Sequence, residues 1–460
     1  MQGNISKRES RRRKDISRRK YEQIAAIVVL LTGVLIFTLL AQMSVKRKFQ
    51  LSREAAIREA AAIALKKNPK DISIDDYAKV RELRLSRKPL IDMKLLEHFN
   101  NLEILEFKDL YIPETDLLVW RWEKPTLRIL NLSDISSLAK LTNLHVIALD
   151  GTKISDIGPL AKLFNLRELR LNITSVFDLE PIRGLTNLQK LWLGLTPVSS
   201  IEPVEGLINL QELELSGTQV SDLTPIRNLT NLKTIWLTEA PVSDIEPIRG
   251  STNLEKLWLK KCPVSDIDSV RRLMKLKELN LEGTQVSNLE PIKELTEIQT
   301  LWLGLTEVSD IEPIGGLIKI QYLDLSSTQV SSITPIEKLT NLQTLNLFST
   351  RVSDLKPIEG LTKLHELWLG RTGIKDLSPL TGLVELRILN LYETQVANLE
   401  PIKNLLNLEE LNISSTAVSN LEPLRELKNL KTLHINYCHL ITDEQVEDLK
   451  TALPGLNINR

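Results

Sequence analysis

Short stretches of the chain alternate apolar with polar residues, and each is followed by apolar residues at a spacing of three. Residues 212–215 read ELEL, and the apolar positions after them are Val220, Leu223 and Ile226. Alternation with period two predicts a strand with one buried face. Spacing of three predicts a tight turn and a short 3₁₀ segment, which proline starts without loss because its missing N–H would be unpaired there anyway.

This unit recurs every 22 residues over most of the chain. Steps of 22 from Leu144 reach Leu or Ile at fourteen successive positions, ending at Leu430. The phase of Thr152 holds Thr at eleven of fourteen positions, and the phase of Pro159 holds Pro at twelve of thirteen. One unit cannot bury its apolar face but stacked units can, so we expect strands paired in parallel into one curved sheet. Irregular copies precede the regular ones, at residues 80–85, 102–107 and 127–132.

The repeated unit resembles a known family. It reads L-x-x-L-x-L-x-x-T-x-V-S-D-I-x-P-I-x-x-L-x-N, as in residues 207–228. It resembles the 22-residue class of leucine-rich repeats, and LTNLxxLxLxxTxVSDIxPI is particularly similar to internalin-type bacterial repeats. Over roughly residues 50–460 this resemblance implies an α/β solenoid: a horseshoe with a parallel concave sheet and 3₁₀ turns on the convex face. The family usually has Asn at the phase of Thr152, so we expect a different hydrogen-bond ladder here.

An uncharged stretch near the N-terminus predicts a membrane anchor. Residues 23–45 carry no charge, which is enough for one transmembrane helix through a hydrocarbon core of roughly 30 Å. Nine Lys and Arg residues precede it, so the positive-inside rule predicts a cytoplasmic N-terminus and periplasmic or extracellular repeats. A cleaved signal peptide is the alternative, although Leu39-Leu40-Ala41 is a poor cleavage site.

The sequence therefore divides into five parts. They are a basic cytoplasmic tail (1–22), a transmembrane signal-anchor helix (23–45), a juxtamembrane segment with an N-terminal helical cap (46–79), leucine-rich repeats (80–440, irregular to about 140) and a C-terminal helical cap (441–460). An Ala-rich helix is expected at 52–66. Thr442 and Gln445 form a T-x-x-Q capping box for the last helix, and such caps cover the open ends of a solenoid.

Composition and motifs argue against nucleic-acid binding and catalysis. Lys+Arg and Asp+Glu both number 59, and the basic excess is confined to the N-terminus, so the repeats lack a basic surface for nucleic acid. No common catalytic or nucleotide-binding motif occurs, so we expect neither enzyme activity nor a cofactor. Cys262 and Cys438 share one phase eight repeats apart. That separation is roughly 40 Å, too far for a disulfide.

Two groups of residues could hold a metal ion, but a structural role explains each of them. His434, Cys438 and His439 are close in sequence, yet Cys438 falls at an inward phase while His434 falls at an outward one. Asp recurs at the phase of Asp156 and Glu two residues later. Stacked carboxylates can bind a divalent cation, but at the start of a 3₁₀ turn they also oppose its partial positive charge. We therefore expect no metal site.

The aromatic residues indicate a binding surface. Between residues 178 and 436 they all occupy outward positions of the predicted strands, and strand propensity alone does not select one face. An exposed aromatic row on a sheet is typical of a surface that a partner covers. The predicted partner-binding residues are Trp192, Trp236, Trp258, Trp302, Tyr322, Phe348, Trp368 and Tyr392.

These residues are expected to form two patches. One is Trp236 and Trp258 beside Lys256, Lys260 and Lys261; the other runs from Trp302 to Tyr392 beside Glu366 and Arg371. The chain is thus interpreted as a single-pass protein of the cytoplasmic membrane that binds a protein ligand through its concave face. Binding of a glycan or the cell wall is the alternative, because Trp and Tyr also stack on sugar rings.

Overall fold

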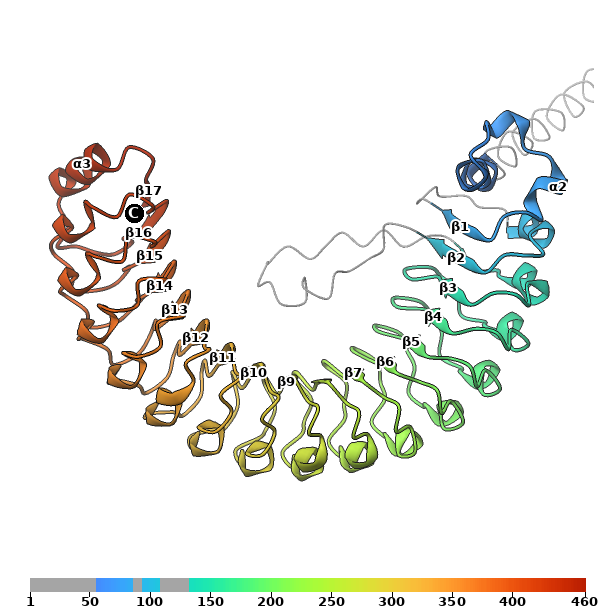
Figure 1. Cartoon of the computed structure of the whole chain (residues 1–460), viewed down its shortest axis with the longest axis horizontal. Helices are drawn as coiled ribbons and strands as arrows, with labels where there is room; N and C mark the ends of the chain where they lie inside the picture. The colour runs from blue at the N-terminus through green and yellow to red at the C-terminus, as the bar shows by residue number, and fades with distance from the viewer. Residues whose placement is uncertain (1–54, 86–92, 108–131) are drawn as a thin grey trace, which may run out of the picture.

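The computed structural model describes residues 55–85, 93–107 and 132–460, which form an open arc (Figure 1). One parallel sheet of 17 strands lines the inner side of this arc, and 3₁₀ segments line its outer side. Each described strand pairs with the next one along the chain. This is the expected horseshoe, with the sheet on the concave face.

The strands are short, and they follow one another at regular intervals. They are β1 (Glu82–Leu85), β2 (Ile104–Phe107), β3 (Val146–Ala148), β4 (Glu168–Arg170), β5 (Lys190–Trp192), β6 (Glu212–Glu214), β7 (Thr234–Trp236), β8 (Lys256–Trp258), β9 (Glu278–Asn280), β10 (Thr300–Trp302), β11 (Tyr322–Asp324), β12 (Thr344–Asn346), β13 (Glu366–Trp368), β14 (Ile388–Asn390), β15 (Glu410–Asn412), β16 (Thr432–His434) and β17 (Asn457–Asn459).

Helical segments connect the strands. The 3₁₀ segments are η1 (Pro69–Asp71), η2 (Met93–His98), η3 (Ser136–Lys140), η4 (Gly158–Leu160), η5 (Glu180–Ile182), η6 (Glu202–Val204), η7 (Thr224–Ile226), η8 (Glu246–Gly250), η9 (Asp268–Arg272), η10 (Glu290–Ile292), η11 (Glu312–Ile314), η12 (Thr334–Lys338), η13 (Lys356–Ile358), η14 (Ser378–Leu380), η15 (Glu400–Ile402) and η16 (Glu422–Leu424). The α-helices are α2 (Ile74–Tyr77), α3 (Asp443–Ala452) and a helix at residues 55–65.

The strand register explains why the repeat holds together. Glu212 lies opposite Thr234 and Leu213 opposite Ile235, an offset of 22 residues, so equivalent residues of successive repeats are neighbours. The inward leucines are fully buried, and one apolar cluster runs from Ile57 to Leu456. Burial of each such side chain stabilises the fold by about 1.5–3 kcal/mol. The repeated apolar pattern is therefore the source of cohesion.

A left-handed residue follows every strand from β3 to β16. Fourteen positions at steps of 22, from Gly151 to Tyr437, have φ between 53° and 69°. Most are not glycine, which costs about 1–2 kcal/mol each, so the turn must be held firmly. The Thr that follows supplies one such hold: Thr218 Oγ1 donates to the carbonyl of Leu215 at 2.6 Å.

Asparagines at a different phase link one repeat to the next. Asn165 Nδ2 donates to the carbonyl of Thr142 at 2.9 Å. Equivalent bonds are made by Asn187, Asn209, Asn231, Asn253, Asn341, Asn407 and Asn429. The sequence prediction of an altered ladder is therefore incomplete: Thr closes its own repeat, whereas the Asn of L-T-N-L joins neighbouring repeats.

The strand expected at residues 127–132 does not lie in the described sheet between its neighbours. Ile104 of β2 is directly opposite Val146 of β3, so these two strands pair with no other strand between them. Residues 127–131 fall outside the described part of the chain. The apolar alternation LRILNL was therefore a misleading signal at this point of the repeat array.

Helical segments occur near both ends of the array. Thr442 accepts a hydrogen bond from the Gln445 N–H at 3.3 Å at the start of α3, but the Gln445 side chain donates to the carbonyl of Ser419 instead of completing the capping box. After α3 the chain adds β17, which sequence reasoning missed, beside β16. Residues 23–45 lie outside the described residues. Within the described ranges, no helix is long and apolar enough to cross a bilayer.

Candidate concave-face binding site

All eight predicted aromatic residues lie at or just after strands of the concave sheet. Trp236, Trp258 and Trp302 are 6%, 5% and 6% exposed, and they form an apolar cluster separate from the main core, with Tyr322 packed against it. The expectation that these three indoles are exposed to solvent is therefore wrong. Neighbouring rings bury one another on the outward face of the sheet. The remaining five aromatic residues are partly exposed.

Indoles two strands apart lean toward each other over the residue between them. The ring centroids of Trp258 and Trp302 are 5.5 Å apart, although two strand spacings amount to about 9.6 Å. Asn280 of the intervening strand is 2% exposed, so the short amide lies beneath the pair. The ring of Trp302 also lies 5.3 Å from that of Tyr322.

Trp192 and Trp236 form the same kind of pair, with a carboxylate between them. Their centroids are 6.0 Å apart, and Glu214 occupies the equivalent position of the intervening strand β6. Desolvation in this aromatic setting raises the pKa of Glu214 to about 7, against hydrogen bonds from Ser216 that lower it. Glu214 therefore exchanges a proton near neutral pH.

A second carboxylate, Asp324, lies near the other end of the aromatic cluster. It is 7% exposed, and burial raises the pKa of this side chain. Asp324 Oδ1 accepts a hydrogen bond from the Ser326 N–H at 2.9 Å, as Glu214 Oε1 does from the Ser216 N–H at 2.7 Å. These two acids are site residues that the sequence prediction did not include.

The aromatic cluster forms part of the lining of a groove of about 510 Å³ on the concave face. Five aromatic residues contribute to it, together with Glu214, Asp324 and two exposed leucines, Leu195 and Leu305. The Nε1 atoms of Trp192 and Trp258 and Ser216 Oγ are buried without a hydrogen-bond partner. Such a combination of apolar walls and a few polar groups is typical of a binding site.

The grouping of the aromatics differs from the two predicted patches. Trp302 and Tyr322 belong with the N-terminal group, because their rings stack toward Trp258. Further along, the Arg371 guanidinium lies 5.7 Å from the Phe348 ring and 5.5 Å from the Tyr392 ring. Arg371 also pairs with Glu393 at 2.7 Å, so the C-terminal group is built around a paired cation.

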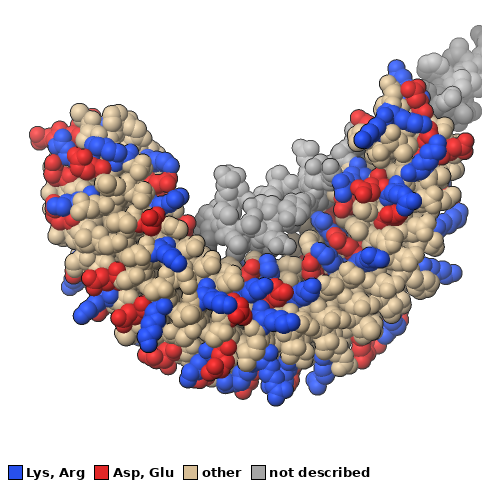
Figure 2. All heavy atoms as spheres, viewed as in Figure 1, with Lys and Arg blue, Asp and Glu red and all other residues tan. Residues whose placement is uncertain are grey.

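The lysines beside the first patch are paired with acids of neighbouring repeats. Lys256 contacts Glu278 at 3.1 Å, Lys260 contacts Glu282 at 2.8 Å and Lys261 contacts Glu239 at 2.6 Å. Figure 2 shows the same mixture of basic and acidic side chains along the visible face of the arc. The expected basic surroundings of this patch are therefore neutralised locally.

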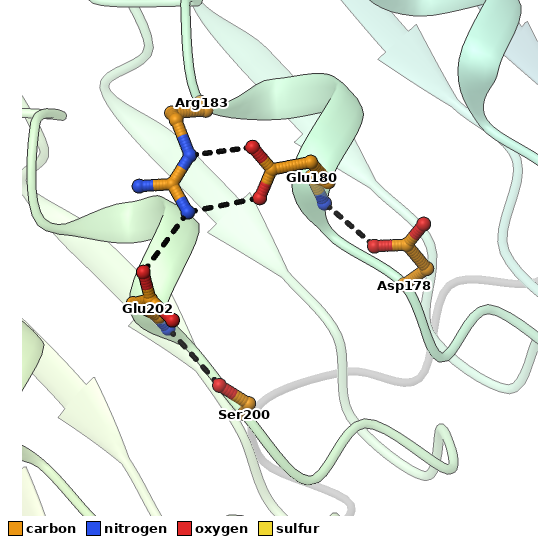
Figure 3. Close-up of polar contacts among 5 residues, drawn as sticks. All are labelled: Asp178, Glu180, Arg183, Ser200 and Glu202. Atoms are coloured by element: carbon orange, nitrogen blue, oxygen red, sulfur yellow. Dashed lines mark hydrogen bonds and ion pairs between the residues drawn. The ribbon is translucent and has the colours of Figure 1, made fainter.

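The recurring acids at the outer side of the arc act as caps. Asp178 Oδ1 accepts from the Glu180 N–H at 2.9 Å at the start of η5, and the guanidinium of Arg183 bridges Glu180 and Glu202 (Figure 3). The same Asp bond recurs at Asp222, Asp244, Asp266, Asp310, Asp354 and Asp376. In the described ranges, no cluster of His, Cys, Asp and Glu has the arrangement of a metal site.

The two cysteines are buried thiols of the Thr phase. Cys262 Sγ donates to the carbonyl of Leu237 at 2.9 Å, and Cys438 Sγ donates to that of Ile413 at 3.0 Å. Both bonds go to the preceding repeat, whereas Thr bonds within its own. Burial raises the pKa of Cys262 to about 12, so this thiol stays protonated at neutral pH.

Comparison with known proteins supports this architecture. A model described as leucine-rich repeats in two copies matches residues 208–250, 252–294, 318–360 and 340–382. The chain is therefore a leucine-rich-repeat protein. A search of curated proteins gives no significant match.

Solved structures share the horseshoe. An internalin, InlF, from Listeria monocytogenes is 24% identical, with 82% of this chain and 94% of that chain covered and a TM-score of 0.56. A leucine-rich-repeat protein of Leptospira interrogans is also 24% identical, with 84% and 97% covered and a TM-score of 0.73. The ectodomain of the plant receptor kinase GASSHO1/SCHENGEN3 from Arabidopsis thaliana, in complex with CASPARIAN STRIP INTEGRITY FACTOR 2, is 16% identical, with 84% and 48% covered and a TM-score of 0.64.

Proposed function

We propose that this protein is a membrane-anchored recognition protein that binds a partner protein through the concave face of its repeats. The observation that carries the proposal is the aromatic groove from Trp192 to Tyr322, which has buried polar atoms without partners. The core explains every inward leucine, but it does not explain an apolar lining on the opposite face of the same sheet. Burial of aromatic rings at a partner's surface is the usual energetic centre of a protein interface.

The solved relatives agree with a binding role at the level of the fold. The Arabidopsis ectodomain was crystallised with CASPARIAN STRIP INTEGRITY FACTOR 2 bound. The fold hosts many functions, so the partner of the present protein must be argued from its own groove. For this chain the relevant groups are the aromatics, Glu214 and Asp324.

Substitution of the partly exposed aromatics tests the binding role. Trp192→Ala with Trp368→Ala should abolish capture of a native partner, because truncation of a central aromatic typically costs about 2 kcal/mol or more of binding free energy. Phe164→Ala with Phe177→Ala is the matched control, since both rings are exposed outside the sheet. Equal capture by the wild type and the Trp variant would place recognition elsewhere. Capture that a soluble oligosaccharide competes away would favour a glycan ligand.

The anchor is proposed from the uncharged residues 23–45 and the nine basic residues before them. Protease added to sealed cells, or to spheroplasts where an outer membrane intervenes, should degrade the repeats and leave a short membrane-bound stub. Full protection of the repeats would contradict the outward orientation. Recovery of the repeats from the soluble fraction without residues 1–45 would instead indicate a cleaved signal peptide.

A further inference from the structure

The groove contains one arrangement of residues twice. Residues 191–196 and 301–306 both read LWLGLT, five repeats apart. In each case the following repeat supplies an acid and then a serine: Glu214 and Ser216 after the first copy, Asp324 and Ser326 after the second. No other pair of Trp residues in the sequence is followed by this combination.

The local geometry is the same in the two copies. Both carboxylates accept the N–H of the serine two residues later, and each lies against the glycine of the preceding repeat. A Cβ on Gly194 would lie 3.0 Å from Glu214 Oε1, and a Cβ on Gly304 would lie 3.1 Å from Asp324 Oδ2. A larger residue than glycine would therefore crowd the carboxylate, so the W-L-G sequence makes room for an acid beside each indole.

These two acids are the carboxylates of the groove that lack a basic partner. Glu239 and Glu282 also line it, but Lys261 and Lys260 neutralise them. Among the described residues no Lys or Arg forms an ion pair with Glu214 or Asp324. The groove thus presents two uncompensated carboxylates, each beside an indole, and a buried unpaired charge is costly.

A cationic group satisfies both features of each position. It pairs with the carboxylate, and it gains from the negative face of the neighbouring indole. The protein already uses such a contact once at this surface: the guanidinium of Arg170 lies 4.8 Å from the centroid of the Trp192 ring and pairs with Asp150 at 3.0 Å. Charge complementarity therefore favours a basic ligand over an acidic or neutral one.

We infer that the groove takes an extended basic polypeptide segment of the partner, with one cationic side chain at Glu214 and another at Asp324. This inference rests on the proposed function and specifies the chemistry of the partner. Five strand spacings separate the two acids along the sheet, about 24 Å. An extended chain advances about 3.3 Å per residue, so the two basic residues of the ligand should be about seven positions apart.

Synthetic fluorescent peptides test the spacing on the full-length chain in mild detergent. The probe is a Gly/Ser peptide with two Arg residues about seven positions apart, blocked at both termini. Its comparisons carry the Arg residues about three positions apart, or Glu in place of both Arg. Fluorescence anisotropy should give the first peptide at least about tenfold tighter binding than the other two. Equal binding of all three peptides, or competition by spermine as effective as by the first peptide, would overturn the inference.

Isosteric variants test the two acids. Glu214→Gln and Asp324→Asn should each weaken binding of the first peptide about tenfold, because each removes one charge-assisted contact. The exchange Glu214→Asp with Asp324→Glu keeps both charges in equivalent settings and should retain binding within about threefold, which separates loss of charge from misfolding. Glu205→Gln and Glu307→Gln are charge-matched controls at exposed positions away from the lining. An equal loss in these controls would show general electrostatics and contradict the assignment.

The outcomes also separate this inference from the proposed function. If Trp192→Ala with Trp368→Ala abolishes partner capture while Glu214→Gln and Asp324→Asn leave peptide and partner binding unchanged, the concave face recognises a partner but not through cations. If the peptide depends on both acids while the native partner ignores the Trp residues, the cation positions exist but the proposed recognition surface is wrong.

Discussion

The two faces of the sheet obey different rules. On the face toward the outer side of the arc, Leu213, Leu257 and Leu301 belong to a column of completely buried aliphatic residues. On the concave face, one residue away, the equivalent column from Trp192 to Asp324 changes identity at almost every strand. The core face must repeat because each unit buries the same neighbour, while the concave face is free to vary. Variation within the array therefore marks where recognition is located.

The contrast is not complete, because part of the concave face is itself buried. Trp236, Trp258 and Trp302 form a second apolar cluster across the sheet from the first. A residue chosen for binding can thus also contribute to stability. The following measurements examine how far the two roles separate.

The largest effect is expected on the core face. Leu281→Ala should lower the free energy of unfolding by about 2–5 kcal/mol, since the side chain is fully buried and its loss leaves a cavity. Chemical denaturation compares this variant with the wild type, and Leu325→Ala, in the same column, should behave alike. A loss below about 0.5 kcal/mol in both would show that this column does not hold the array together.

The indoles should fall into two classes. Trp302→Ala should lower the free energy of unfolding by about 2–3 kcal/mol, because it removes a buried ring that packs against Trp258 and Tyr322. Trp368 is partly exposed, so Trp368→Ala should cost less than about 1 kcal/mol. Thermal unfolding of both variants checks the order, and similar losses would erase the distinction between the cluster and the exposed aromatics.

Glu214 should make stability depend on pH in the alkaline direction. Its pKa is raised in the folded chain to about 7, so its contribution is fully present below the pKa of the unfolded chain and is lost as pH rises through about 7. Glu214→Gln removes this dependence and should be more stable than the wild type at pH 8, on the order of 2 kcal/mol. Urea unfolding at pH 5 and pH 8 measures the difference, which should be small at the lower pH. An equal difference at the two values would contradict the burial of a charged Glu214.

The smallest effect is expected in the turns. Thr284 Oγ1 donates to the carbonyl of Leu281 at 2.7 Å, and the side chain is 3% exposed. Thr284→Ala should cost about 1 kcal/mol, whereas Thr284→Ser keeps the hydroxyl and should cost less. Denaturant unfolding of the two variants decides this, and a Ser variant as unstable as Ala would assign the effect to packing of the methyl group.

The repeated part of the fold could be predicted from sequence, for a physical reason. Inward positions such as Leu213 and Leu215 recur at fixed spacing, and the parallel register follows from stacking identical units. The pattern failed where repetition failed: the alternation at 127–132 predicted a strand, but β2 pairs with β3. The strand β17 was missed because its register follows an offset of 25 residues from β16 and not 22.

The candidate site could be predicted only in part. The outward phase of Trp192 and Trp302 was readable, but the stacking that buries Trp302 depends on which residue lies on the strand between two indoles. Glu214 and Asp324 were overlooked because each acid is ordinary in its own repeat. The signal that distinguishes them is the second period of five repeats, visible in the two copies of LWLGLT.

Site-directed photo-cross-linking in the native host tests the central claim most directly. A benzophenone amino acid replaces Trp368 on the concave face or, in a second variant, Phe177, which is 64% exposed outside the sheet. Both variants are irradiated in intact cells, and the cross-linked products are compared. The account predicts a discrete protein adduct from position 368 and none from position 177. The same adduct from both positions, or an adduct from position 177 alone, would contradict recognition by the concave face.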